Sequence, residues 1–188
     1  MRVVYVVEEK PKIFDLIKKI LRIKDGEKNI FLYGDADFST DIKKYMTENN
    51  VLIFKSVGAD FMSACENKPD IDLAVLGELK KCGDIAGLGN IKSVLLNIEN
   101  SRGIKCSDKN AQIITCGLKE KDTVIFSSIN LDEGGVILDL QRSVKNIDGE
   151  TIEPFEKQIS IPESVKKENI ESEDLILSLT ALVICGRL

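Results

Sequence analysis

Short apolar runs alternate with amphipathic or polar segments through the first half of the chain. These runs are rich in β-branched and aromatic residues, which favour buried strands, and they cover Arg2–Val7, residues 29–34, Val51–Ser56 and residues 72–77. Strands of this kind that are separated by helices pair in parallel through crossover connections, because both of their faces are covered. The first half is therefore predicted to be a doubly wound, mainly parallel α/β sheet.

Two helices are predicted between these strands. The first follows Pro11, a residue that suits the first helical turn because no backbone donor is needed there. Its apolar residues recur at helical spacing and are Ile13, Leu16, Ile17, Ile20 and Leu21. They form one apolar face, which is expected to pack on the sheet. The second helix covers residues 40–49, with Asp37 or Ser39 as its N-cap.

After residue 89 the apolar runs lie too close together for helices to intervene. Five strand-like runs follow, at residues 93–98, 111–116, 123–129, 136–143 and 158–161. Gly134–Gly135 and Asp148–Gly149 lie between such runs, as the turns of hairpins do. Antiparallel or mixed pairing is therefore predicted for the second half.

The last apolar stretch, ESEDLILSLTALVICG, predicts a helix that Ser172 caps and Gly186 ends. Glu173 and Asp174 favour its N-terminus through the helix dipole. Because this helix is apolar nearly all round and far too short to cross a membrane, it is expected to lie buried against the sheet.

Composition agrees with one compact globular domain. Of the 188 residues 43% are hydrophobic and 30% are charged, and a subdivision is conceivable only near residue 90, where the pattern changes. The net charge of −5 argues against a nucleic-acid partner, which needs a basic surface. No apolar run approaches the roughly 20 residues of a membrane helix, and no signal peptide is recognisable, so we expect a cytoplasmic protein without a membrane partner.

Histidine and cysteine usage excludes several kinds of chemistry. The chain has no histidine, which rules out Ser-His-Asp and Cys-His mechanisms and removes the commonest metal ligand. Its cysteines are scattered and never form C-x-x-C; they are Cys65, Cys82, Cys106, Cys116 and Cys185. Neither a disulfide framework nor a zinc site is indicated, so we expect buried reduced thiols, no metal and no cofactor.

The segment GDADFSTDIK, which starts at Gly34, lies between a predicted strand and a predicted helix, where a P-loop would bind phosphate. It has Ser39 in place of the second glycine and Thr40 in place of the lysine. Asp35 and its acidic neighbours place negative charge where a triphosphate needs a positive potential, although acids of this kind can hold Mg²⁺. Helix capping and turn formation explain the segment better than nucleotide or magnesium binding.

Two further segments share part of the pattern of a known kind of site. Glu8 and Glu9 follow the first strand, as acidic residues do in response-regulator receiver domains, but the third strand ends in Ser56 and supplies no acceptor aspartate. The glycine-rich stretch GDIAGLGN is predicted to follow a helix and precede a strand, whereas a dinucleotide-binding motif follows a strand and precedes a helix. It is therefore interpreted as a loop that connects two elements.

Polar residues also flank the strand DTVIFSS and end the strand after it. They are Lys119, Lys121, Asp122, Ser127, Ser128, Gln141 and Arg142. Gathered at one edge of the sheet, they would suit recognition of an anion or a peptide. Outward-facing alternation on a half-solvated sheet also explains them, and this interpretation is favoured.

Four motifs follow one another from residue 92 onward. SVLLNIEN carries Asn97, Glu99 and Asn100 at its end, and QIITCGL carries Gly117. The short strands DTVIFSSI and GGVILDLQRS come next, and ISIP, a spacer and the helix LILSLTALVICG complete the series. This order resembles the end of the central domain of the Mur ligase family, the ATP-dependent amide-forming enzymes of peptidoglycan precursor synthesis and their folate and cyanophycin relatives.

The resemblance implies a related sheet without the family's chemistry. The family's ATP-binding Gly-Lys-Thr/Ser loop, the His-Asn pair before its final helix and its C-terminal domain have no counterpart in this sequence. The machinery for acyl-phosphate formation is therefore expected to be absent, and no catalytic residue is carried across.

Two functions stay open. The first is a non-catalytic, Mur-ligase-like domain that acts as a binding or interaction module, by implication in a cell-envelope or related bacterial pathway. Its partner would be a protein, a small molecule or a second copy of the chain. The alternative is an enzyme or sensor that binds a small anionic or nucleotide-like ligand at the carboxyl ends of the parallel strands. The candidate ligand-binding residues there are Glu8, Glu9, Gly34, Asp35, Ser56 and Gly77.

Overall fold

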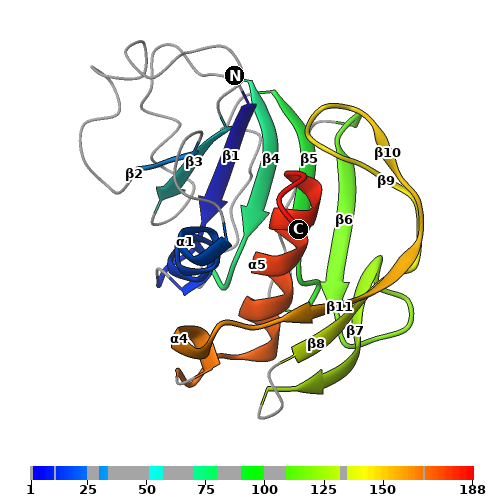
Figure 1. Cartoon of the computed structure of the whole chain (residues 1–188). Helices are drawn as coiled ribbons and strands as arrows, with labels where there is room; N and C mark the ends of the chain where they lie inside the picture. Colours follow the sequence, from blue (N-terminus) through cyan, green and yellow to red (C-terminus); the bar gives the residue numbers. More distant parts are fainter. Residues whose placement is uncertain are drawn as a thin grey trace.

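The described part of the chain forms a nine-stranded sheet with helices packed on one of its faces (Figure 1). A computed structural model describes residues 2–10, 12–24, 30–33, 51–56, 70–79, 90–99, 109–131, 135–166 and 168–188. The order of the strands across the sheet is β11-β8-β7-β6-β5-β4-β1-β3-β2. The seven strands from β7 to β2 pair in parallel, while β8 and β11 pair antiparallel, so the predicted fold class is confirmed.

The elements have the following bounds. The parallel strands are β1 (Arg2–Val7), β2 (Ile30–Tyr33), β3 (Val51–Ser56), β4 (Ile71–Leu76), β5 (Ile91–Leu96), β6 (Gln112–Gly117) and β7 (Val124–Asn130). The remaining strands are β8 (Gly135–Leu140), β9 (Val144–Lys145), β10 (Thr151–Ile152) and β11 (Phe155–Ser160). The helices are α1 (Lys12–Lys24), α4 (Glu163–Lys166) and α5 (Ser172–Ile184).

Parallel pairing continues past residue 89, where the sequence predicted a change. Strands β5 and β6 still pair in parallel, and the antiparallel part begins only at β7. Strands β6 and β7 share only two residue pairs, Cys116 with Val124 and Gly117 with Ile125. Residues 118–123 are too few for an ordinary crossover, so β7 overlaps only the end of β6 and then runs on beyond it. Figure 1 shows β7, β8 and β11 set at a steep angle to β6.

Both predicted hairpins are present. Strands β7 and β8 pair antiparallel up to Asn130 and Gly135, and β9 and β10 form a separate two-stranded hairpin. Gly149 has φ +86° in the second turn, a conformation that glycine adopts at little cost, and its N–H donates to the Asn146 carbonyl at 3.0 Å. The sequence did not predict β9 and β10, because two-residue strands leave no periodic pattern.

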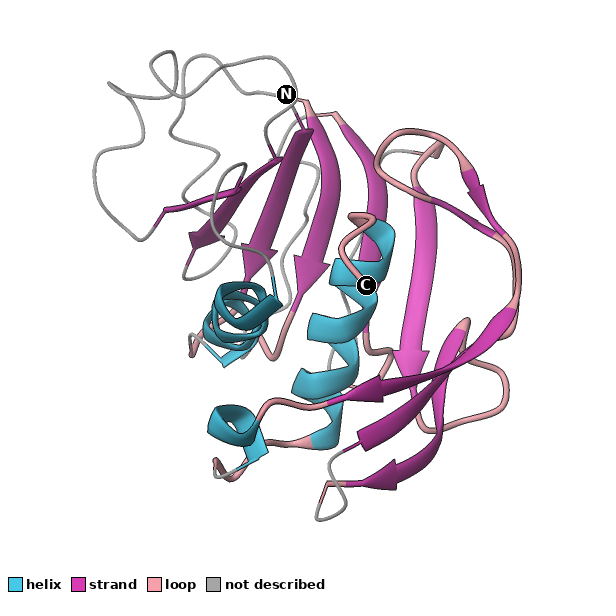
Figure 2. Cartoon of the chain, in the orientation of Figure 1, coloured by secondary structure: helices cyan, strands magenta, loops and turns pink. Residues whose placement is uncertain are grey.

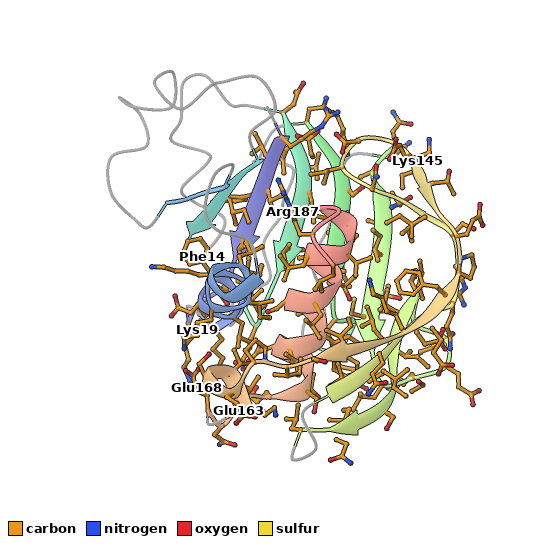
Figure 3. The ribbon with its side chains drawn as sticks, viewed as in Figure 1. Phe14, Lys19, Lys145, Glu163, Glu168 and Arg187 are labelled. Carbon is orange, nitrogen blue, oxygen red and sulfur yellow. The ribbon has the colours of Figure 1, made fainter. Side chains whose placement is uncertain are left out.

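Helix α1 buries the face that its spacing predicted, since Ile13, Leu16, Ile17, Ile20 and Leu21 are at most 5% exposed. It lies beside α5, and an ion pair of 2.5 Å between Lys19 and Glu168 joins it to the segment that follows α4 (Figure 3). Pro11, the helix predicted at residues 40–49 and its capping candidates lie outside the described residues.

Helix α5 ends as predicted but begins differently. Ser172 is its first helical residue, so the prediction that Ser172 caps it was wrong. The N-cap is Glu171, whose backbone is extended and whose side chain pairs with Lys12 at 2.8 Å instead of capping. Gly186, at φ +67°, ends the helix in a Schellman motif, because its N–H donates to Val183 and the next N–H, of Arg187, donates to Leu182.

The core lies between the sheet and the helices α1 and α5, which stand on the same face (Figure 2). Helix α5 is buried from Asp174 to Ile184, as its apolar composition predicted. Cys116 and Cys185 are buried free thiols, and the other three cysteines lie outside the described residues. Within the described ranges, no helix is long and apolar enough to cross a membrane.

Candidate functional site

The parallel strands β1, β4, β5 and β6 end at one edge of the sheet, which we call the C-terminal edge (Figure 1). Open α/β sheets bind their ligands outside this edge. By sequence, four of the six predicted site residues end or directly follow a parallel strand, and these are Glu8, Gly34, Ser56 and Gly77. The other two, Glu9 and Asp35, come one residue later.

Glu8 closes the N-terminus of helix α1. It is 2% exposed, and its carboxylate oxygens accept the N–H groups of Ile13 at 2.8 Å and Phe14 at 3.0 Å. These are the second and third residues of the helix, whose N–H groups have no partner within it. The carboxylate therefore fills the place where the helix dipole and the free N–H groups would attract a phosphate.

Gly77 allows this arrangement. A Cβ atom added to it would lie 2.9 Å from the Glu8 Cβ and 2.8 Å from the Ile13 Cδ1, both closer than such atoms normally approach. Its N–H donates to the Val7 carbonyl at 2.9 Å, and the Glu9 N–H donates to the Glu78 carbonyl at 3.3 Å. The absence of a side chain at Gly77 thus lets Glu8 and helix α1 approach the end of β4.

The remaining predicted residues are placed only in part. Ser56 pairs with Val7 in the register of β3 and β1, so its backbone lies at the same edge as Glu8. Gly34 and Asp35 lie outside the described residues. The structure thus brings Glu8, Glu9 and Gly77 together, next to the backbone of Ser56.

A second part of the C-terminal edge, at the ends of β5 and β6, carries the Mur-like motif residues. Asn97 is 3% exposed, and its Oδ1 accepts the Glu99 N–H at 2.8 Å. Asp122 is 4% exposed, accepts the Lys119 N–H at 3.3 Å and lies directly against Gly117. The Lys119 ammonium pairs with the Glu99 carboxylate across the two strand ends. These contacts enclose a cavity of only about 50 Å³.

Two apolar side chains are exposed beside this small cavity. Ile98 is 44% exposed and Leu118 is 58% exposed, and both line the cavity. The sequence did not reveal them as surface residues, because Ile98 ends the strand predicted at residues 93–98 and Leu118 directly follows the apolar strand β6. Charged residues lie around them, namely Glu99, Lys119, Lys121 and Glu173. We call this group of six the β5–β6 patch.

The polar cluster that the sequence predicted is divided in two. Lys119, Lys121 and Asp122 belong to the turn after β6, at the C-terminal edge. Ser127 lies on the antiparallel strands, where its hydroxyl donates to Glu156 at 2.6 Å, and Gln141 contacts Asp139 at 3.5 Å. A single binding site built from all of these residues is therefore not formed.

The described thiols are unsuited to nucleophilic chemistry. Burial raises the pKa of both Cys116 and Cys185 from 9.0 to about 12, so neither forms a thiolate at neutral pH. Burial also raises the pKa of Asp174, although the Lys12 ammonium at 3.2 Å opposes this. In the part of the chain that the structure describes, no group of three acidic or thiol side chains could hold a metal ion.

Comparison with known proteins supports the α/β fold described above. No protein-family model matches the chain, and no curated protein matches its sequence. In structure it is similar to the MurF ligase of Thermotoga maritima, solved in complex with ADP, with a TM-score of 0.51 and 14% sequence identity. The match covers 100% of this chain but 46% of the ligase, so the chain spans less than half of that enzyme. At this identity the likeness concerns the fold alone, and the fold of this chain is Mur-ligase-like.

Proposed function

We propose that this chain is a non-catalytic, Mur-ligase-like domain that acts as a binding module. The observation that carries this proposal is the carboxylate of Glu8 at the N-terminus of α1. In a sheet of this kind, the N-terminus of a helix that follows a central strand is a favoured place for phosphate. Here the chain fills that place with its own negative charge.

A phosphate could bind there only by displacing Glu8. The displacement breaks two hydrogen bonds to a charged acceptor, each worth about 1.5–3 kcal/mol. A total of roughly 3–6 kcal/mol corresponds to an affinity that is weaker by about two to four powers of ten. The Glu8 side chain has little room to move, because it is 2% exposed and its Cβ lies close to Gly77. Nucleotide binding at α1 is thus disfavoured by the geometry of this one side chain.

The β5–β6 patch supports the binding role. Protein interfaces have an apolar centre and a polar rim. In the β5–β6 patch, Ile98 and Leu118 form the apolar centre and the charged residues around them form the rim. In the described part of the chain, neither Lys121 nor Glu173 forms an ion pair, and they carry opposite charges. Two copies related by a twofold axis could bring Lys121 of each against Glu173 of the other, which makes the patch self-complementary. The partner we propose is therefore a second copy of the chain.

Calorimetric titration with Mg²⁺-ADP and Mg²⁺-ATP tests the non-catalytic part of this proposal. We expect no heat of binding and no change in melting temperature. A nucleotide that bound would stabilise the fold by about 2.7 kcal/mol at a hundredfold excess over its Kd, and this result would overturn the proposal. It would favour the alternative of a nucleotide-binding enzyme or sensor that uses the carboxyl ends of the strands.

Sedimentation equilibrium tests the second part. We expect the wild-type chain to associate, and Leu118→Glu to shift it to a monomer because the substitution places a carboxylate in the centre of the patch. Ile129→Glu is the matched control, since Ile129 is 41% exposed on β7 and does not line the cavity. A monomeric wild type, or equal effects of the two substitutions, would refute the dimer.

A further inference from the structure

A larger cavity lies at the opposite edge of the sheet, where the parallel strands begin. It has a volume of about 530 Å³ and lies between the starts of β1, β4, β5 and β6 and the β9–β10 hairpin. Ligand-binding cavities commonly have volumes of roughly 300–1,000 Å³. We call it the N-terminal cavity, and the residues that matter here are Arg2, Asp72, Lys92, Ser93, Lys145 and Asp148. Figure 1 shows the hairpin passing over the strand starts, and Figure 3 labels Lys145 on it.

The acidic groups of the cavity are already neutralised. Asp72 is 4% exposed; its carboxylate accepts the Val3 N–H at 2.7 Å and lies 2.6 Å from the Lys92 ammonium. The Arg2 guanidinium donates to the Asp148 carboxylate at 2.8 Å and lies 4.0 Å from Asp72. Both carboxylates therefore have cationic partners from the wall of the cavity itself.

The hairpin that covers the cavity is held in place at two points. The Lys145 N–H donates to the Gln112 side-chain oxygen at 2.9 Å, and the Gln112 amide donates back to the Lys145 carbonyl at 3.4 Å. Further along, the Ile147 N–H donates to the Ile184 carbonyl at the end of α5, at 3.1 Å. The backbone that carries Lys145 is thus fixed to both the sheet and the helix.

Two hydrogen-bonding groups of the cavity have no partner among the described residues. Ser93 is only 6% exposed and lines the cavity, yet its hydroxyl makes no hydrogen bond there. Lys145 lines the cavity from the hairpin, and its ammonium forms no ion pair with any described residue. With Arg2, Lys92 and Lys145 against Asp72 and Asp148, the lining carries one positive charge in excess. A serine hydroxyl and a lysine without an ion pair among the described residues, both from residues that line a cavity with an excess of positive charge, are suited to an anion.

We propose that the N-terminal cavity binds the carboxylate or phosphate group of a small polar molecule, with Lys145 and Ser93 as its donors. The ammonium supplies the charge, and the hydroxyl supplies a directed hydrogen bond from the strand β5. Arg2 and Lys92 hold the carboxylates of Asp148 and Asp72 away from the anion. This site is separate from the C-terminal edge and does not depend on the β5–β6 patch.

NMR titration of the whole chain tests this proposal, with inorganic phosphate and succinate as the two probes and with ionic strength held constant by sodium chloride. We expect at least one probe to cause saturable shifts of the Gln112, Lys145 and Ile147 amides. The probe that binds identifies the anionic group. Lys145→Met and Ser93→Ala should each weaken that binding by about tenfold or more, because each removes a hydrogen bond to a charged group.

Lys157→Met is the matched control, because Lys157 lies on the exposed strand β11 and does not line this cavity. It should leave the affinity unchanged. Circular dichroism and the melting temperature confirm that each variant is folded, and the two binding variants serve as checks on each other. Absence of saturable shifts with both probes, or equal affinities of Lys145→Met and Lys157→Met, would overturn the proposal.

Discussion

Replacing Gly117 by alanine tests the corner at which β6 meets β7. A Cβ atom added there would lie 2.3 Å from the Asp122 Oδ2 and 3.1 Å from its Cγ. Asp122 cannot easily withdraw, because it is buried in the turn and the adjacent Thr123 N–H donates to the Thr115 hydroxyl at 2.9 Å. Overpacking of this kind costs about 1–3 kcal/mol. For a chain of this length, each kcal/mol lowers the melting temperature by roughly 2–4 °C.

Urea unfolding followed by circular dichroism measures this cost. Gly135→Ala is the control, because the nearest atom to an added Cβ there is the Ile159 carbonyl oxygen at 3.4 Å, an ordinary contact. We expect its effect to stay within about 0.5 kcal/mol. Adding Asp122→Ala to Gly117→Ala removes the clash, so the two changes should couple by about 0.5–3 kcal/mol. Equal stabilities of the two glycine variants, or additive effects of the pair, would refute the reasoning.

Three further predictions follow from buried polar groups. Glu8→Gln leaves one backbone N–H of α1 facing an amide N–H, so we expect the free energy of unfolding in urea to fall by about 1–3 kcal/mol; an unchanged value would contradict the capping role. Burial raises the pKa of Asp174 above its ordinary value of 3.8. Asp174 therefore stabilises the folded state fully below pH 3.8, and this stabilisation is lost as pH rises through the pKa of the folded state. A carboxyl NMR titration should show this raised pKa, and Lys12→Met should raise it further; a lower pKa in that variant would disprove the ion pair. With Cys65, Cys82 and Cys106 replaced by serine, the thiols of Cys116 and Cys185 should react with a thiol reagent at pH 8 only after unfolding. Labelling of the native protein would contradict their burial. Because the pKa of these thiols is about 12 in the folded state and 9.0 when free, the free energy of unfolding should also fall as pH rises from 9.0 to about 12.

Much of the sheet could be predicted from the sequence, since β1 and β3 are mainly apolar runs with the predicted bounds. The N-cap of α5 was misplaced by one residue: it is Glu171, which makes no side-chain cap and pairs instead with Lys12 of another helix.

The candidate sites were less accessible to sequence reasoning. Glu8 was identified at the C-terminal edge, but its role at α1 depends on a side-chain direction that no spacing encodes. The N-terminal cavity was missed because Ser93 and Lys145 are far apart in the sequence and meet only through the β9–β10 hairpin. Long-range geometry of this kind leaves no local pattern.

Helix α5 also determines when this chain can complete its core. The ribosome makes α5 after the strands that the helix contacts, which are β4, β5, β6 and β7. The Ser178 hydroxyl contacts the Ile13 carbonyl at 3.4 Å, so α1 too packs against a segment that is translated much later. Until residues 172–184 emerge, the apolar face of the nascent sheet stays open to other chains and to chaperones. Folding is therefore expected to follow translation of α5, and a nascent chain that stalls before it would be prone to aggregate.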